Sequence, residues 1–176
     1  MLFRPFVVDA KSGEKIYVEI VEASEADIVA TSKDPKWQTD WSSNYLNSSG
    51  IDKFAIKSKE GELIGLGAYE IRGKQTYVFI LYAESAPHSN PTMHARRDRK
   101  YYGIGRLLIA NGIKYSIDNG CRGDVVFDAK TDELAKHYER DFMAKQIFRG
   151  GSGPKRFMLA DEDAWRLFSE YLEEAE

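Results

Sequence analysis

Cysteine is almost absent from this sequence, since Cys121 is the only one among 176 residues. A lone cysteine excludes an internal disulfide framework, which suits a reducing compartment. No apolar run approaches the roughly 20 residues that are needed to span a bilayer. The N-terminal stretch lacks a signal-peptide profile, because Arg4, Pro5 and Asp9 interrupt its apolar residues. These absences predict a cytoplasmic protein without a membrane segment.

Neither sign of charge dominates, because 25 Lys and Arg stand against 28 Asp and Glu, for a net charge of -3. A protein that binds nucleic acid over its whole surface is usually basic, so this class is disfavoured. The fractions of hydrophobic residues (43%) and charged residues (30%) are typical of a globular protein. We expect a single domain spanning residues 1–176, as a monomer or a homodimer.

Hydrophobic patterning predicts a mixed α/β domain. Glu60-Gly61-Glu62 separates two patterned runs and indicates a hairpin. The run Thr76–Ala83 is almost continuously apolar, as in a strand buried on both faces. The predicted strands are Ile16–Val21, Phe54–Lys59, Leu63–Ile71, Thr76–Ala83, Val125–Ala129, Lys145–Phe148 and Arg156–Leu159.

Helices are predicted from caps and from four-residue spacing. Ser24 is expected to cap Glu25–Ser32, Thr131 to cap Asp132–Arg140, and Asp161 to cap a final helix. Another helix is expected over Gly105–Asn119, ending at Asn119-Gly120. Trp37, Trp41 and Tyr45 are expected on one helix face, and Trp165, Phe168 and Leu172 on another. The first of these stripes suits either a core or an acceptor pocket.

The segment Arg96–Leu108 (RRDRKYYGIGRLL) has the composition of an anion-binding helix start. Gly103 and Gly105 stand where a helix begins, and five basic residues surround one acid. Glycine allows a ligand close to the backbone, while the N–H groups and dipole of the first helical turn attract anions. The basic side chains would add charge-assisted hydrogen bonds to phosphate. The alternative is a solvated basic loop before a helix, because two glycines alone are a weak signal.

Lys100–Gly105 (KYYGIG) resembles the acyl-CoA pyrophosphate loop Q/R-x-x-G-x-G/A of the GNAT superfamily of N-acyltransferases, with Lys100 in place of Gln or Arg. The following helix and strand match the family's order. TDELAKHYERDFMAKQI resembles its closing motif, with Tyr138 on the family's Tyr, Thr131 on its Asn and Met143 near its Gly. A nearer likeness is to a bacterial and phage branch of the family. The resemblance covers roughly residues 54–171.

The resemblance implies a splayed central sheet of about six to seven strands flanked by helices. Acyl-CoA would lie between the strands Thr76–Ser85 and Val125–Ala129. Backbone groups near Ala83, Glu84 and Ser85 would pair with the pantetheine arm and polarise the thioester carbonyl. The expected cofactor-binding residues are Ala83, Ser85, Arg99, Lys100, Tyr102, Gly103, Ile104, Gly105, Arg106 and Thr131.

Tyr138 and Glu84 are the predicted catalytic residues. A phenol is protonated at neutral pH, so Tyr138 could donate a proton to the leaving thiolate. Glu84, at the end of a buried strand, could accept the proton of the amine, directly or through water. The alternatives are a packing role for Tyr138 and an exposed loop position for Glu84. Lesser candidates are Glu70, Asp128, His94 and His137, and Cys121 is expected to be structural.

The sequence thus predicts transfer of the acetyl group of acetyl-CoA to a primary amine in a ternary complex. The acceptor is expected to be a small molecule or a peptide, with no metal ion. Two alternatives stay open. One is a CoA-binding or interaction module without catalysis, which the atypical Lys100, Thr131 and Met143 motivate. The other is a toxin-like acetyltransferase that acts on aminoacyl-tRNA, for which the basic segment would serve the nucleic acid.

Overall fold

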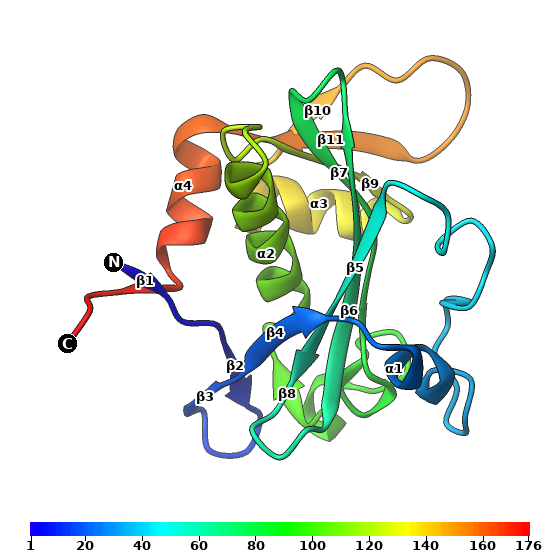
Figure 1. Cartoon of the computed structure of the whole chain (residues 1–176), viewed down its shortest axis with the longest axis vertical. Coiled ribbons are helices and arrows are strands. Elements are labelled where there is room, and N and C mark those ends of the chain that lie inside the picture. Colours follow the sequence, from blue (N-terminus) through cyan, green and yellow to red (C-terminus); the bar gives the residue numbers. More distant parts are fainter. The chain divides into compact units, whose positions relative to one another are not determined.

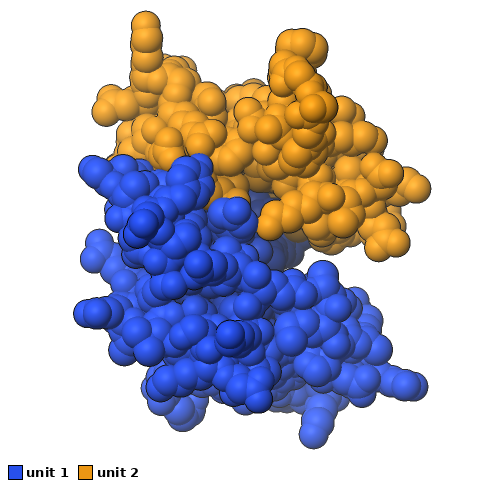
Figure 2. Space-filling model, turned by 90° about the vertical axis from the view of Figure 1, so that its right-hand side faces the viewer, with its two compact units in different colours: residues 1–68, 82–109, 173–176 blue, residues 69–81, 110–172 orange.

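The computed structural model describes residues 1–176, which form two compact units (Figure 2). Unit 1 comprises residues 1–68, 82–109 and 173–176, and unit 2 comprises residues 69–81 and 110–172. The chain passes from one unit to the other inside strand β6 (Leu63–Arg72), strand β7 (Tyr77–Ser85), helix α2 (Ile104–Asp118) and strand β12 (Leu172–Glu173). None of the helices combines the length and the apolar character that are needed to cross a bilayer.

The main sheet has seven strands in the order β10-β11-β9-β7-β6-β5-β4 (Figure 1). Strands β7 and β9 pair in parallel, with a register that runs from Val78↔Val125 to Ile80↔Phe127. The pairs β9–β11, β11–β10 and β5–β4 are antiparallel, so the sheet is mixed, as predicted. The remaining bounds are β4 Glu19–Glu22, β5 Ile51–Lys57, β9 Val125–Ala129, β10 Lys145–Ile147 and β11 Lys155–Leu159.

Two small sheets complete the strands. β2 (Phe6–Asp9) pairs with β3 (Lys15–Tyr17) and with β8 (Tyr101–Tyr102). β1 (Leu2–Phe3) pairs with β12 (Leu172–Glu173). The strand predicted as Ile16–Val21 is therefore wrong in its continuity, since it divides between two sheets at Val18. The amide N–H of Val18 still donates to the carbonyl of Pro5 (3.0 Å), which extends the β2–β3 pairing, whereas Glu19 already pairs with Lys57 of β5.

The helix of unit 1, α1 (Glu25–Ala30), begins as predicted at Ser24. The Ser24 hydroxyl accepts from the Asp27 N–H while the Asp27 carboxylate accepts from the Ser24 N–H, which forms a capping box. Residues 31–50 then follow as turns instead of the second helix that Trp37, Trp41 and Tyr45 predicted. Trp41 is fully buried, but Tyr45 is 55% exposed, so these residues do not share one face.

The helices of unit 2 pack on a core that includes Phe127, Phe157 and Leu159. Helix α3 (Asp132–Asp141) has the predicted cap, because the Thr131 hydroxyl accepts from the Leu134 N–H at 3.1 Å. Helix α4 (Asp161–Ser169) does not have its predicted cap.

The residue at the N-cap of α4 is Ala160, while Asp161 itself has a φ of 51° and no capping side-chain bond forms. The stripe predicted on α4 is also wrong. Trp165 is 52% exposed and Leu172 lies in β12, whereas Ala164, Leu167 and Phe168 are buried.

Candidate functional site

The start of helix α2 has open space beside its two glycines, Gly103 and Gly105. Gly103 has a φ of 84°, a conformation that favours glycine, and its carbonyl accepts the first helical bond from Leu107 N–H (3.0 Å). The N–H groups of Ile104, Gly105 and Arg106 precede that bond and have no partner in the helix itself. A Cβ at Gly103 or Gly105 would meet no other protein atom within 4 Å. This geometry fits an anion that approaches the first turn.

Loop residues before β8 bring arginines toward that helix start. The guanidinium of Arg96 lies 4.3 Å from the ring centroid of Tyr102, whose hydroxyl donates to the Arg96 carbonyl (2.9 Å). The Arg99 Nε donates to the carbonyl of His94 at 3.3 Å. The side chain of Arg97 is 87% exposed. The loop contains two single 3-10 turns, η1 (Pro87–Ser89) and η2 (Arg96–Asp98).

Lys100, the first residue of the resemblance motif, is bound to a carboxylate of its own chain. Its Nζ lies 3.0 and 2.9 Å from the two carboxylate oxygens of Glu62. This hydrogen-bonded pair raises the pKa of Lys100 above its usual value. The ammonium is thus charged but already neutralised by a partner.

Glu84, near the end of β7, holds a segment that is far away in sequence. Its carboxylate accepts from the N–H of Gln38 (2.7 Å), the N–H of Thr39 (3.1 Å) and the indole Nε1–H of Trp41 (2.9 Å). The residue is 8% exposed, so the alternative of an exposed loop carboxylate is wrong. The ring of Trp41 packs edge-on against Tyr82, with centroids 6.3 Å apart.

The hydrogen bonds of Glu84 explain why residues 37–41 do not continue a helix. Two backbone N–H groups that a helix would use internally donate to the carboxylate instead. The same bonds give Glu84 an anchoring role in the structure. Its role as a general base stays a prediction, and so do the roles of its neighbours on β7, the exposed Ala83 and the half-buried Ser85.

Tyr138 on α3 is held by aromatic contacts alone. Its ring meets Phe127 and Phe157 edge-on, with centroids 4.8 and 6.0 Å away, and stacks on Phe142 at 5.8 Å. The structure gives its hydroxyl no hydrogen bond within the chain. Burial raises the pKa of Tyr138 above the value of a free tyrosine, which keeps the hydroxyl protonated at neutral pH.

Thr131 borders an open depression of about 680 Å³ in unit 2. Its hydroxyl is used as the cap of α3, and the other lining residues are Ala129, Lys130, Asp132, Gly153, Pro154 and Lys155. Whether Thr131 binds a cofactor there stays a prediction.

Three of the four lesser candidates for a general base, all except His94, are engaged in ion pairs. Glu70 binds Arg72 (3.1 Å), and Asp128 binds the guanidinium of Arg156 (2.8 Å). His137 contacts the carboxylate of Asp141 one helical turn away. The pair of Asp128 and Arg156 is set by the register of β9 and β11, which the sequence alone does not show.

The structure resembles solved N-acetyltransferases at low sequence identity. A spermidine N-acetyltransferase from Vibrio cholerae, solved with CoA and spermine, matches with a TM-score of 0.55 at 14% identity, over 84% of this chain and 97% of that chain. A GNAT-family acetyltransferase from Staphylococcus aureus matches with a TM-score of 0.54 at 11% identity, over 80% of this chain and 97% of that chain. No protein-family model and no curated protein matches the sequence.

Proposed function

Starting from the GNAT fold that these matches establish, we propose that the protein transfers the acetyl group of acetyl-CoA to a primary amine. The observation that carries the proposal is the start of α2. There, a Cβ at Gly103 or Gly105 would meet no protein atom within 4 Å, and the helix begins directly after a loop of arginines. The sequence resemblance assigns this position to the pyrophosphate of acyl-CoA.

The residues at the helix start fit a pyrophosphate. The backbone N–H groups of Ile104, Gly105 and Arg106 would donate to its oxygens, and the helix dipole would favour its negative charge. Arg99 and Arg106 are the side chains proposed to add charge-assisted hydrogen bonds. When bound, acetyl-CoA would supply the activated acyl group as a thioester.

In the proposed reaction, the amine nitrogen bonds to the thioester carbonyl carbon and the carbon–sulfur bond breaks. The sulfur leaves with the bonding electrons as a thiolate and takes the proton of the Tyr138 hydroxyl. The phenol is protonated at neutral pH, as a proton donor must be, and its ring contacts fix its position. The nitrogen loses its extra proton to a base, for which Glu84 is the candidate, directly or through water.

The acceptor is proposed as an amine, without a narrower class. One of the similar structures is a spermidine N-acetyltransferase, so polyamines belong in the first panel of acceptors, beside amino acids, peptides and aminoacyl-tRNA. Release of CoA thiol would be measured together with the mass of the acetylated amine. Thiol release that depends on an amine supports the proposed transfer, whereas binding of CoA without transfer to any acceptor favours the non-catalytic module.

A substitution at Gly105 tests the phosphate site separately from the fold. A Cβ at this position meets no protein atom, and the helix dipole favours a carboxylate in the first turn, so Gly105→Asp is expected to change the free energy of unfolding by less than about 1 kcal/mol. The motif accepts Ala at this position, so the test uses a charge: the carboxylate would repel a phosphate at the first turn, and we expect affinity for CoA to fall at least about tenfold in calorimetry.

Gly150→Asp is the matched control, because a Cβ at Gly150 also meets no protein atom and lies outside the helix start. Unchanged CoA affinity in Gly105→Asp, or no heat of CoA binding to the wild type at millimolar concentration, would contradict the proposal.

A further inference from the structure

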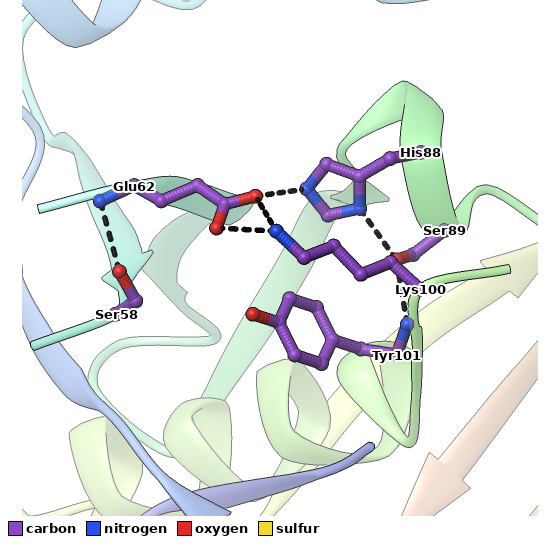
Figure 3. A network of polar contacts seen from close by, with 6 residues as sticks. All are labelled: Ser58, Glu62, His88, Ser89, Lys100 and Tyr101. Carbon is purple, nitrogen blue, oxygen red and sulfur yellow. Dashed lines mark hydrogen bonds and ion pairs between the residues drawn. The ribbon is translucent and has the colours of Figure 1, made fainter. Parts of the chain in front are cut away.

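The carboxylate of Glu62 bridges the two sides of a loop that carries arginines toward the start of α2 (Figure 3). We define the arginine loop as residues 90–99, and its neck as His88 and Ser89 on the incoming side and Lys100 and Tyr101 on the outgoing side. Glu62 binds Lys100 Nζ through both oxygens, at 3.0 and 2.9 Å. Its Oε1 also lies 3.0 Å from His88 Nε2, off the line of an ideal hydrogen bond.

The backbone of the neck closes at the same place. The Lys100 N–H donates to the His88 carbonyl (3.0 Å), and the Tyr101 N–H donates to the hydroxyl oxygen of Ser89 (3.0 Å). The Ser89 hydroxyl lies 2.6 Å from His88 Nδ1 and can donate to it, because its oxygen already accepts from Tyr101. The side chains and the backbone therefore fasten the two sides of the neck in one connected network.

Glu62 is itself fixed by the turn between β5 and β6. Its N–H donates to the Ser58 hydroxyl (3.0 Å), and its carbonyl accepts from the Ser58 N–H (2.9 Å). Ser58 is 5% exposed, so the turn is anchored in the body of unit 1. The carboxylate thus connects a rigid hairpin to both sides of the neck.

The arginine loop runs directly into the helix start. After the neck, Tyr101 and Tyr102 pair with Asp9 and Val8 of β2, and Gly103 follows. Within the loop, Arg96 packs on the ring of Tyr102. Any loosening of the neck would therefore move the arginines relative to the N–H groups of α2.

We propose that Glu62 is a positioning residue of the phosphate site, because it holds Lys100 and His88 and so closes the neck of the arginine loop. Lys100 acts through this closure and is not a direct ligand of the phosphate. The inference rests on the proposed function and adds a residue that the motif does not contain. It also opposes the sequence prediction that Lys100 binds the cofactor as a cation.

Two roles for Lys100, direct binding of the phosphate or closure of the neck, predict opposite changes of CoA affinity in the variant Glu62→Gln. A phosphate-binding Lys100 would be released from its competing carboxylate, and affinity for CoA would rise. A Lys100 that closes the neck would lose its partner, and affinity would fall. The variants Glu62→Gln and Lys100→Gln are both expected to weaken CoA binding about threefold to tenfold, and the double variant is expected to be no weaker than the weaker single variant.

Matched controls lie on the same hairpin. Glu60→Gln and Lys59→Gln make the same changes of charge at exposed positions and should leave CoA affinity unchanged. Lys100→Arg keeps a cation for Glu62 and should retain affinity. In acetyl transfer, Glu62→Gln is expected to raise KM for acetyl-CoA and to leave kcat unchanged. Tighter binding in Glu62→Gln, or an affinity equal to that of Glu60→Gln, would overturn the inference.

Amide hydrogen exchange without cofactor separates this inference from the proposed function. Glu62→Gln should speed exchange at the N–H groups of Lys100 and Tyr101, while Glu60→Gln should not. Faster exchange in Glu62→Gln would support the closure of the neck by Glu62, even if the wild type does not bind CoA. A wild type that does not bind CoA would contradict the acetyl-transfer proposal alone. Unchanged exchange in Glu62→Gln would remove the closure even if the wild type binds CoA.

Discussion

The end of β7 in unit 1 and the middle of α3 in unit 2 hold their predicted catalytic side chains in opposite ways. Glu84 uses its carboxylate to accept three N–H donors from residues 38–41. Tyr138 is held through its ring, and its hydroxyl has no partner in the chain. The carboxylate of Glu84 stabilises the fold because its oxygens accept hydrogen bonds from the same chain. The ring of Tyr138 fixes the position of its hydroxyl, and that hydroxyl makes no hydrogen bond within the chain. Glu84 thus anchors residues 38–41 in addition to its proposed role as a base, whereas the contacts of Tyr138 leave its hydroxyl available for its proposed role as an acid.

The largest effect is expected from removal of the Glu84 carboxylate. Glu84→Ala leaves buried N–H groups without an acceptor, and we expect a loss of about 3 kcal/mol in the free energy of unfolding. For a chain of this length the melting temperature should fall by roughly 6–12 °C. Urea and thermal denaturation measure the change.

Glu84→Gln is the companion variant, because it keeps the size of the side chain and one acceptor oxygen and should lose less stability. If Glu84→Gln were as stable as the wild type and yet inactive, the proposed role of Glu84 as a base would be supported, whereas a stable and fully active Glu84→Gln would leave Glu84 the anchoring role alone.

The next effect is expected in turnover and not in stability. Tyr138→Phe keeps the ring contacts with Phe127, Phe142 and Phe157 and removes only the hydroxyl. The free energy of unfolding should change by less than about 1 kcal/mol, since no internal hydrogen bond is lost. Loss of the proposed proton donor should lower kcat about 100-fold, with little change in the affinity for acetyl-CoA.

Steady-state kinetics and calorimetry together measure the Tyr138→Phe effect. Tyr115→Phe is a control in the same unit, on a tyrosine without a proposed catalytic role. Wild-type turnover in Tyr138→Phe would exclude Tyr138 as the acid.

The smallest change in stability is expected at Asp141, an exposed carboxylate, whereas Glu84 is a buried one. The hydrogen bond from Arg140, with a further contribution from His137, lowers the pKa of Asp141 to about 2. Because the pKa of Asp141 in the folded protein lies below its unfolded value of 3.8, the ionised carboxylate stabilises the fold at pH values above 3.8. That contribution is lost as the pH falls toward about 2.

Asp141→Asn should therefore have a lower free energy of unfolding than the wild type at pH 5. This difference in stability should shrink as the pH approaches 2. Denaturation curves across this range, with Asp118→Asn as a control for another exposed helix carboxylate, test the sign. A difference that grows on acidification would contradict it.

Much of the fold was predictable because local signals act within a few residues. The Ser24 and Thr131 caps, the hairpin at Gly61 and the helix end at Gly120 each depend on one residue and its immediate neighbours. The continuous apolar runs that predict β7 and β9 also form strands. The glycine spacing that predicts the start of α2 likewise lies where the helix begins.

One wrong prediction and one missed residue share a cause that local spacing does not contain. Trp37, Trp41 and Tyr45 have helical spacing, but hydrogen bonds to Glu84, more than 40 residues away, unwind that segment. Glu62 was missed for the same reason, because its partners on the neck lie 26 and 38 residues further along the chain. Positioning carboxylates in this protein are recognisable only from tertiary contacts.

Trp41 gives the segment around Glu84 a built-in optical probe. Its indole is fully buried, donates to Glu84 and packs on Tyr82, whereas Trp165 is half exposed. An indole in such a dry, fixed environment emits at shorter wavelength than one in water, so any opening of residues 37–41 would shift the fluorescence to the red. Stopped-flow fluorescence could therefore follow the motion of this segment in unlabelled protein while an amine or acetyl-CoA is added.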